Sequence, residues 1–279
     1  MNKKVLIVGL GLIGGSYAQG LTLKGYEVGA IDTNSESIKY GLDNNLIKWG
    51  QTEVSEDYIK MFDIVIFALY PHVLINWLKQ YQKFFKKGTI ITDVTGVKGW
   101  VVKEINKFLR DDIEYVGTHP MAGREVYGVE NSDYKIFKGA NYIIIPCDAK
   151  DYVIEEIRKI GQALEFKNIV MLSPEDHDEM IGFLSQLTHV IAVSLMTCKE
   201  SEHLVEYTGD SFRDLTRIAN INENMWSELF LLNKEELVSQ ITLFEQQLSK
   251  LKKTIENEDV NEMKEMMKLS TLNRSYFDE

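Results

Sequence analysis

Three glycines near the start of the chain, Gly9, Gly11 and Gly14, follow a short apolar run and precede a stretch with helical periodicity. This spacing in this context predicts the turn between the first strand and the first helix of a Rossmann-type fold. In such a turn the first glycine permits the tight bend, the second lets the backbone approach a pyrophosphate, and the third lets the helix pack close to the sheet. We therefore expect the turn, with the backbone amides of Leu12 and Ile13, to bind the phosphates of a dinucleotide.

An acidic residue follows the second apolar run. Asp32 stands eighteen residues after Gly14 and directly after residues 28–31. At the end of the second strand of such a fold, a carboxylate accepts hydrogen bonds from the adenosine ribose and repels a 2′-phosphate. Residues 33–36 contain no arginine to hold that phosphate. The sequence therefore favours NAD over NADP as the cofactor.

Short apolar runs alternate with helical patterns in the first half of the chain. Strands are expected at residues 4–8, 26–31, 63–69, 89–93, 115–118 and 141–145. Between them lie expected helices, among them residues 12–24, 72–85 and 100–109. This alternation predicts an α/β fold with a doubly wound parallel sheet that is covered by helices on both faces.

The pattern changes near residue 172. Ser173 and Pro174, followed by two acidic residues, are typical of a helix start. Beyond them the apolar residues keep helical spacing, most clearly over residues 177–199 and 224–255, and no strand is expected. The second half of the chain is therefore predicted to be all-α.

This change predicts two domains. Residues 1–172 are expected to form an NAD-binding Rossmann domain, and residues 173–279 an all-α domain. Helical domains joined to dinucleotide folds often dimerise and wall the substrate site, so we expect the second domain to do both by analogy.

Composition excludes several classes of function. The formal net charge of -11 and the pI of about 5.1 argue against nucleic acid as a partner. No apolar run approaches the roughly 20 residues that span a bilayer, so no membrane partner is expected. Cys147 and Cys198 lack disulfide-like or ligand-like spacing, which favours a reducing cytoplasm. No histidine, cysteine and acidic residues have metal-ligand spacing, so no metal is expected.

Polar residues follow two of the expected strands, where ligands of such folds bind. Residues 93–99 include Thr95, and residues 117–125 include His119. Pro120 keeps His119 out of a helical conformation. A histidine so placed can take the proton of a substrate hydroxyl as hydride leaves for a nicotinamide, or it can be a structural histidine with ordinary hydrogen bonds.

Two further patterns lie in the helical half. Ser185 and His189 are four residues apart and share one helix face, which is otherwise mostly apolar. Arg217, three residues after Asp214, is suited to bind a carboxylate through two hydrogen bonds. An ordinary packed helix and a surface ion pair explain these patterns equally well. His177, with the acid that follows it, is interpreted as a polar residue of a helix start.

Five motifs occur in order along the chain. They are Gly-Leu-Gly-Leu-Ile-Gly-Gly-Ser at 9–16, Asp93 with Val97-Lys98, His-Pro-Met-Ala-Gly at 119–123, Ser-Gln-Leu-Thr-His at 185–189, and Phe-Arg-Asp-Leu-Thr-Arg-Ile-Ala at 212–219 followed by Trp226. A chain with these motifs resembles the prephenate dehydrogenases, over about residues 3 to 255. The histidine and arginine motifs are much more specific than the glycine turn.

The resemblance implies an NAD-dependent oxidative decarboxylation in tyrosine biosynthesis. Prephenate carries a ring hydroxyl, a ring carboxylate and a pyruvyl side chain. Hydride leaves the hydroxyl-bearing carbon, carbon dioxide leaves the ring, and aromatisation to 4-hydroxyphenylpyruvate supplies the driving force. The resemblance also implies a homodimer formed through the helical domain.

Roles for single residues follow from the same resemblance. His119 is implied to accept the hydrogen bond of the ring hydroxyl, and Arg217 to bind the ring carboxylate. Four more residues are implied to line or gate the substrate pocket: Ser185, His189, Glu125 and Trp226.

One position departs from the family pattern. Many members carry a serine where this chain has Gly96, and that serine hydrogen-bonds the catalytic histidine and the nicotinamide. The adjacent Thr95, or a water molecule, is a candidate substitute.

Three alternatives stay open. Arogenate dehydrogenases perform the same chemistry on a side chain that bears an amine. Dehydrogenases of the β-hydroxyacid type use a catalytic lysine on the helical domain, where this chain offers Ser185 and His189. A non-catalytic NAD-sensing module would need an effector surface, such as a basic DNA-binding helix, and the acidic composition provides none.

Overall fold

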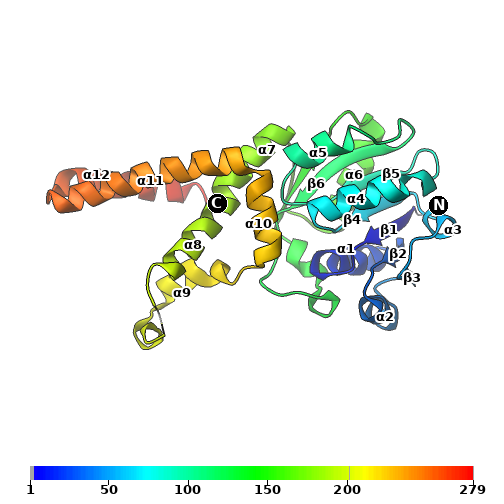
Figure 1. Ribbon diagram of the computed structural model, residues 1–279, viewed down its shortest axis with the longest axis horizontal. Coiled ribbons are helices and arrows are strands. Elements are labelled where there is room, and N and C mark those ends of the chain that lie inside the picture. Colours follow the sequence, from blue (N-terminus) through cyan, green and yellow to red (C-terminus); the bar gives the residue numbers. More distant parts are fainter. Residues whose placement is uncertain (1–2, 201, 279) are drawn as a thin grey trace.

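The computed structural model of the chain describes residues 3–200 and 202–278. An α/β part comes first, and a helical part extends away from it (Figure 1). The last strand of the α/β part is β8 (Asn168–Met171), and the helical part begins with α7 (Pro174–Ile181). The predicted fold class, a Rossmann-type sheet followed by an all-α region, is confirmed.

The described residues form one eight-stranded sheet in the order β3-β2-β1-β4-β5-β6-β7-β8. The other strands are β1 (Lys4–Val8), β2 (Glu27–Ile31), β3 (Trp49–Gln51), β4 (Ile64–Phe67), β5 (Ile90–Asp93), β6 (Glu114–Pro120) and β7 (Asn141–Ile145). The chain reverses its direction of winding between β1 and β4, so their carboxyl ends border the crevice where dinucleotides bind in such sheets.

The sequence predicted a parallel sheet, but one pair of strands is antiparallel. β7 pairs with β6 in antiparallel fashion, with Gly117 opposite Ile145, and β8 then runs parallel to β7. A parallel β7 would need a crossover that carries the chain back to the end of the sheet where β6 begins. Residues 121–140 instead run over α1 in two short 3-10 turns. The chain then enters β7 at the end of the sheet where β6 finishes.

Two strands were missed. β3 has only three residues, and its sequence Trp-Gly-Gln has no apolar alternation. β8 lies at the sheet edge and is largely exposed, although residues 169–172 form a short apolar run that was not expected to be a strand. The remaining strands were placed correctly because both of their faces are buried.

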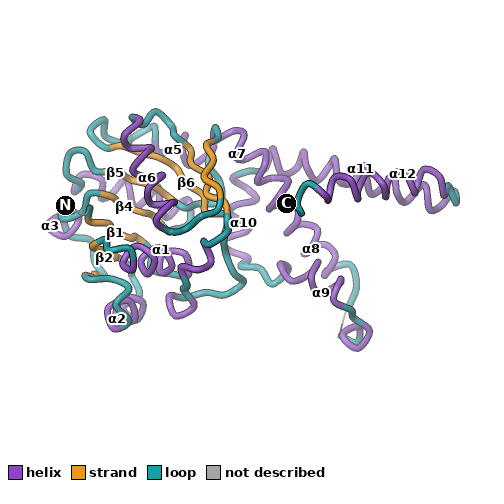
Figure 2. The backbone as a smooth tube through the Cα atoms, turned by 180° about the vertical axis from the view of Figure 1, so that it is seen from behind, coloured by secondary structure: helices purple, strands orange, loops and turns teal. Residues whose placement is uncertain are grey.

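Helices cover both faces of the sheet, as predicted (Figure 2). The helices of this part are α1 (Leu12–Leu23), α2 (Ser35–Asp43), α3 (Glu56–Ile59), α4 (Pro71–Tyr81), α5 (Gly99–Ile105) and α6 (Asp151–Ala163). Alternate residues of β1 serve two cores: Val5 and Ile7 pack with α1, α2 and α6, and Leu6 and Val8 pack with α3, α4 and α5. Burial on both faces accounts for the unbroken apolar run of this strand.

The helical part contains five further helices in the described residues. They are α8 (Leu187–Thr197), α9 (Asp210–Thr216), α10 (Glu223–Leu232), α11 (Lys234–Glu256) and α12 (Val260–Ser275). α11 and α12 form a hairpin that projects away from the sheet (Figure 1). At the start of α7, the Ser173 hydroxyl accepts a hydrogen bond from the backbone N–H of Asp176, as its capping motif predicts.

Two expected helices are interrupted. The helix over residues 177–199 contains a π-helical turn, Gly182–Gln186, between α7 and α8. The helix over residues 224–255 breaks at Asn233, which separates α10 from α11. Both interruptions lie beside one another, because the Asn233 side chain donates hydrogen bonds to the Gln186 side chain and to the backbone carbonyl of Asp178.

One helical stretch also departs from the expectation about membrane spans. Among the described residues, Pro174–Thr197 is long and apolar enough to cross a membrane by length and composition alone. The expectation that no such run exists is wrong, because residues 180–198 contain no acidic residue, lysine or arginine, and their serine, threonine and histidine residues add no full charge. Core helices of soluble proteins pass the same test. This stretch packs against α5, α9 and α11, as a helix of a folded domain does.

Candidate active site

The glycine turn between β1 and α1 has the geometry of a phosphate cradle. Gly9 adopts φ +93°, and a Cβ there would lie 2.4 Å from the carbonyl oxygen of Ala68. A Cβ at Gly14 would lie 1.9 Å from the carbonyl oxygen of Gly9. At Gly11 a Cβ would meet nothing within 4 Å, so it would project into the open space before the helix. Two of these glycines are required by packing, and the third keeps the approach to the helix N-terminus clear.

The start of α1 supplies backbone donors to that space. Leu12 and Ile13 occupy its first turn, where N–H groups have no partner within the helix. No acidic side chain lies in this turn, so the positive end of the helix dipole is not neutralised. The turn therefore fits the pyrophosphate of a dinucleotide.

Asp32 lies beside the turn, at the end of β2. Its carboxylate accepts hydrogen bonds from the backbone N–H of Leu10, at 2.6 Å, and of Asn34, at 2.8 Å. These bonds hold a partly exposed carboxylate at the edge of the crevice. The structure thus places Asp32 next to the glycine turn, as the sequence spacing predicts.

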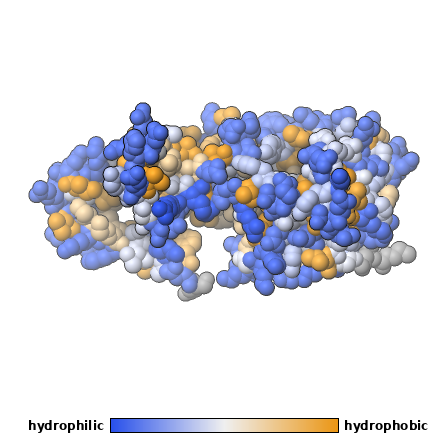
Figure 3. Space-filling view, turned by 90° about the horizontal axis from the view of Figure 1, so that it is seen from below, coloured by the Kyte–Doolittle hydropathy of each residue, from blue (hydrophilic) through white to orange (hydrophobic). Residues whose placement is uncertain are grey.

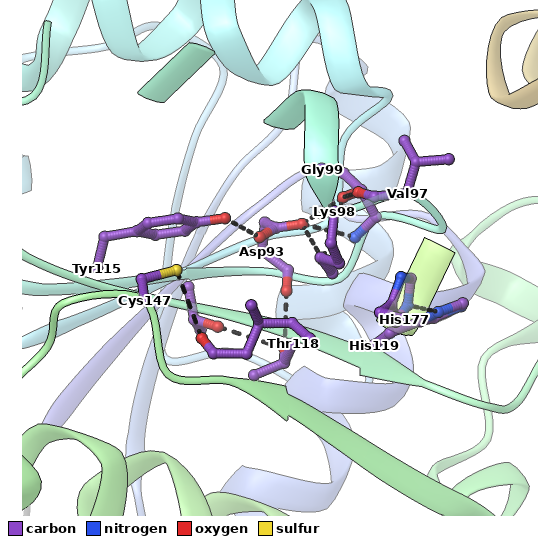
Figure 4. A network of polar contacts seen from close by, with 12 residues as sticks. Asp93, Val97, Lys98, Gly99, Tyr115, Thr118, His119, Cys147 and His177 are labelled. Atoms are coloured by element: carbon purple, nitrogen blue, oxygen red, sulfur yellow. Dashed lines mark hydrogen bonds and ion pairs between the residues drawn. The ribbon is translucent and has the colours of Figure 1, made fainter. Parts of the chain in front are cut away.

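His119 lies near the end of β6, and its ring faces a second histidine (Figure 4). Its Nδ1 is 2.9 Å from Nε2 of His177, which comes from α7 in the helical part. The pKa of His119 lies well below the usual histidine value, chiefly because the residue is largely buried, and also because His177 and Lys98 are near. His119 is therefore neutral at physiological pH and has the charge state of a base.

His177 and Asp178 are site residues that the sequence interpretation missed. His177 is completely buried, and its Nδ1 is 2.7 Å from Oδ1 of Asp178. Asp178 also accepts hydrogen bonds from the backbone N–H groups of Lys98 and Gly99, each at 2.8 Å. Their place at a helix start was read as local capping, but their partners lie 58 to 80 residues away along the chain.

A buried ion pair holds the loop after β5. Lys98 Nζ lies 2.5 Å from Asp93 Oδ1, and both side chains are 0% exposed. The Tyr115 hydroxyl donates to the same carboxylate at 2.7 Å (Figure 4). Burial lowers the pKa of Lys98, and the attraction of Asp93 opposes this effect. The pair fixes the loop that contacts Asp178 and keeps a positive charge close to His119.

The hydroxyl of Thr95 belongs to this ion-pair network. It donates to the Asp93 carboxylate and lies 2.9 Å from the carbonyl oxygen of Val97. The hypothesis that Thr95 replaces a family serine beside His119 is therefore corrected, because the hydroxyl is turned toward Asp93 and its loop. A Cβ at the neighbouring Gly96 would be in ordinary contact with Leu229, so packing does not demand glycine there.

The residues predicted to contact substrate gather where the two parts meet. The Arg217 guanidinium forms an ion pair with Glu125, which lies in the loop after His119. The His189 ring stacks on Trp226, with ring centroids 3.7 Å apart. The pKa of His189 is lowered, first by burial, and the charges of Glu125 and Arg217 also act on it. Arg217 pairs across the two parts of the chain, whereas the sequence suggested Asp214 as a neighbour.

Ser185 joins this group through its backbone. Nδ1 of His189 donates to the carbonyl oxygen of Ser185 at 2.9 Å, one helical turn earlier. That bond leaves the other nitrogen of His189 without a proton in the neutral ring and fixes the ring against Trp226. In the space-filling view the two parts form separate lobes with a notch between them (Figure 3).

This arrangement combines three chemical capabilities. The glycine turn and Asp32 offer a dinucleotide site, His119 offers a neutral base, and Arg217 offers a cation for an anionic substrate. Within the described residues, no group of three or more histidine, cysteine or acidic side chains is placed to hold a metal ion. The site is therefore suited to the oxidation of a hydroxyl group on an anionic molecule.

Comparisons with known proteins agree with this description. The family model "Prephenate dehydrogenase, nucleotide-binding domain" matches residues 18–170, and "Prephenate dehydrogenase, dimerization domain" matches residues 173–269. A prephenate dehydrogenase of Lactococcus lactis is 31% identical over 267 residues, which cover 92% of this chain and 72% of that protein. A cyclohexadienyl dehydrogenase of Zymomonas mobilis is 27% identical over 286 residues, covering 96% of this chain and 94% of that protein.

The fold agrees as well. A crystal structure of prephenate dehydrogenase from A. aeolicus, in complex with hydroxyphenyl propionate and NAD+, superposes with a TM-score of 0.89. The two chains are 30% identical, and the match covers 99% of each. The glycine turn, the histidine at the strand end and the helical second part all lie within the matched length, and this chain belongs to the prephenate dehydrogenase family of NAD-dependent oxidoreductases.

Proposed function

We propose that this protein converts prephenate to 4-hydroxyphenylpyruvate and carbon dioxide with NAD as the oxidant, a step of tyrosine biosynthesis. The observation that carries the proposal is the placement of His119 near the end of β6, against His177 of the helical part, with the Arg217–Glu125 ion pair also joining the two parts. A base and a cation at this edge of a dinucleotide fold suit a substrate that has both a hydroxyl and a carboxylate.

The cofactor is held by residues of the α/β part. Gly9, Gly11 and Gly14, with the amides of Leu12 and Ile13, receive the pyrophosphate, and Asp32 receives the adenosine ribose. NAD, when bound, supplies the hydride acceptor. Thr95 supports this region indirectly, since its hydroxyl holds the loop of Asp93 and Lys98.

His119 handles the proton of the reaction. As the hydroxyl-bearing ring carbon is oxidised to a carbonyl, the hydroxyl proton passes to the free nitrogen of His119. The bond between the ring and its carboxylate then breaks, its electron pair enters the ring, and the carbonyl oxygen becomes a phenolate. That oxygen takes the proton back, so His119 returns to its neutral form.

Substrate recognition is assigned to the group around Arg217. Its guanidinium binds the ring carboxylate, and its partner Glu125 closes that side of the site. Trp226 and His189 form a stacked wall against the ring, and Ser185 lies beside them on the same helical stretch. These contacts hold the hydroxyl-bearing carbon in one orientation, which raises the rate by positioning.

We further infer a homodimer formed through the helical part. Apolar side chains are exposed there, among them Phe183, Leu184, Leu231, Leu243 and Leu248, and Figure 3 shows such residues on that lobe. The family model that matches residues 173–269 is described as a dimerization domain. We place the domain division at residues 172 and 173, between β8 and the Ser173 cap. The free cysteines, Cys147 and Cys198, are compatible with a reducing cytoplasm.

The alternative substrate is arogenate, whose side chain carries an ammonium. Recognition of that group needs an acid, and Glu125, the ion-pair partner of Arg217, is one acid of this group. We favour prephenate because relatives that match most of this chain are prephenate dehydrogenases.

The test is an assay of the purified protein. Prephenate and arogenate are each supplied with NAD or NADP, and reduced nicotinamide is followed by its absorbance. We expect turnover with prephenate and NAD. The His119→Asn variant is expected to lose roughly a hundredfold or more in kcat while its Kd for NAD is unchanged. Normal turnover by this variant would contradict the role given to His119.

A further inference from the structure

His119 touches the helical part through a continuous chain of side chains. From the geometry of this chain we infer that His177 and Asp178 are positioning residues, which hold His119 in the tautomer with a proton on Nδ1 and a free lone pair on Nε2. The inference rests on the proposed role of His119 as a base. It adds residues whose function lies outside substrate and cofactor contact.

Asp178 determines which group donates in this series of hydrogen bonds. Its carboxylate receives hydrogen bonds from the backbone N–H of Lys98 and of Gly99, each at 2.8 Å. A carboxylate has acceptors and no donor. The 2.7 Å contact between Asp178 and Nδ1 of His177 therefore requires a proton on that nitrogen.

His177 in turn determines which nitrogen of His119 carries the proton. The ring of His177 is fully buried, and burial, with the positive charge of Lys98, lowers its pKa despite the opposing effect of Asp178. In the neutral ring with a proton on Nδ1, Nε2 is an acceptor. The 2.9 Å contact then requires His119 to donate from its own Nδ1 (Figure 4). Nε2 of His119 is left free to accept the substrate proton.

The structure makes specific room for this arrangement. A Cβ at Gly99 would lie 2.9 Å from Oδ2 of Asp178, so the absence of a side chain lets the carboxylate approach the backbone. The Asp178 carbonyl is held in turn by Asn233, at 2.8 Å. The chain of contacts is therefore fixed at its far end by two separate segments, the loop after β5 and the break between α10 and α11.

The donor and acceptor order of these hydrogen bonds affects the reactivity of His119. A neutral imidazole without a fixed partner populates both tautomers, and the one with a proton on Nε2 cannot accept a proton there. Loss of a carboxylate that orients a catalytic histidine is known to cost serine proteases much of their activity for this reason. His177 and Asp178 thus act on the fraction of His119 that is ready to react.

The tautomer can be measured directly by nitrogen-15 NMR on protein labelled at histidine, without substrate. In the wild-type protein we expect His119 to carry its proton on Nδ1. His177→Gln places an amide oxygen near the position of Nε2 and should keep this tautomer. His177→Leu and Asp178→Asn should give a mixture. His203→Gln, at an exposed turn of the helical part, is the control and should leave the His119 signals unchanged.

Kinetics with prephenate and NAD supply the second readout. We expect His177→Leu to lower kcat by roughly tenfold to a hundredfold, with KM and the Kd for NAD within about twofold, and His177→Gln to recover most of kcat. A wild-type His119 protonated on Nε2 would overturn the inference, even if the Leu variant failed to fold. Unchanged kcat in a folded His177→Leu variant would do the same. Failure of prephenate as a substrate would instead concern the proposed function, since the spectrum needs no substrate.

Discussion

At the scale of single residues, the site is dominated by groups that oppose protonation of His119. Its ring is largely buried, His177 lies 2.9 Å away, and the Lys98 ammonium is close enough to act on it. The charge of Lys98 is balanced locally by Asp93, so the positive charge is tolerated in a buried place. The result is a base that is ready at neutral pH.

This environment predicts the acid side of the pH profile. His119 acts in its neutral form, and its pKa in the folded protein lies below the usual histidine value. Activity should therefore be constant as pH falls to about 6.5, the pKa of an unperturbed histidine, and should decline only below it. We expect kcat/KM for prephenate, measured between roughly pH 5 and 9, to begin its acidic decline only below this pH. A decline that begins above pH 7 would contradict the description of His119.

The residues of the site were predictable to different degrees. His119 and Arg217 stand in distinctive motifs, and the sequence placed both. His177 and Asp178 follow a helix-start motif that explains their polarity locally, so nothing in the sequence connects them to His119. Thr95 was correctly noted in a polar loop, but which group its hydroxyl faces depends on the buried Lys98, whose partner is set by the folded loop.

At the scale of elements, the β1–α1 turn separates two uses of glycine. Gly14 is required because a Cβ would overlap the carbonyl oxygen of Gly9, whereas the space at Gly11 is open to the cofactor. The same sequence pattern thus contains a packing requirement and a binding requirement.

Matched variants distinguish the two. Gly14→Ala should lower the free energy of unfolding by about 2 kcal/mol or more, because the overlap forces the turn to move. Gly11→Ala should lower it by less, about 1 kcal/mol or below, because its Cβ would meet nothing within 4 Å and the remaining cost is that alanine is a poorer N-cap than glycine. It should still weaken NAD binding at least tenfold, or about 1.4 kcal/mol. Chemical denaturation and calorimetric titration check both; equal loss of stability in the two variants would refute the distinction.

The break at Asn233 is a second element with a physical cause. Its amide donates 2.8 Å hydrogen bonds to the Asp178 carbonyl and to the Gln186 side chain, and all three groups are buried. These bonds join α7, the π-helical turn and the start of α11. Helical periodicity alone cannot show such a break, because the apolar spacing continues through it.

Removing this amide should destabilise the fold. Asn233→Ala leaves the buried Gln186 side-chain oxygen without its donor and removes one of the two donors to the Asp178 carbonyl, at a cost of about 2 kcal/mol. We expect Tm to fall by roughly 5–10 °C. Asn224→Ala, which removes an exposed side-chain contact on α10, is the control and should change Tm by less than about 2 °C. Comparable shifts for the two variants would argue against the role of Asn233.

The helices and strands were predicted correctly where burial requires a recognisable pattern of apolar residues. β4 is apolar throughout, and β1 is apolar after Lys4, because both of their faces are covered. β3 and β8 lie at the two edges of the sheet: β3 has three residues without apolar alternation, and the short apolar run of β8 is mostly exposed. The antiparallel direction of β7 was also beyond the sequence, because a buried strand has the same composition in either direction.

At the scale of the whole molecule, hydrogen bonds tie the helical part to the α/β part at two places. At the start of α4, Glu228 of α10 accepts from the backbone N–H of His72 at 2.8 Å, and Asn222 donates to the Tyr70 hydroxyl at 3.0 Å. At the loop after β5, Asp178 accepts hydrogen bonds from the backbone N–H groups of Lys98 and Gly99. The helical part also exposes many apolar residues, which suits the proposed dimer.

The dimer can be tested with two exposed leucines. Light scattering should give a mass twice the 32.1 kDa of one chain. Leu248→Glu on α11, where the leucine is 55% exposed, should weaken the dimer at least tenfold, about 1.4 kcal/mol, because it places a charge in an apolar interface. Leu23→Glu, at the end of α1 and 64% exposed, should not. A monomeric wild-type protein would exclude the dimer.

The contact of Asp178 with the loop after β5 also bears on how such enzymes can be recombined. The α/β part contains the cofactor residues and His119, and in this respect it resembles a module that any helical partner could complete. The base, however, takes its immediate neighbour from that partner. A chimera that brought in a foreign helical half would bind NAD and yet work poorly, unless the new half carried the histidine and aspartate pair and Gly99 were kept to receive it.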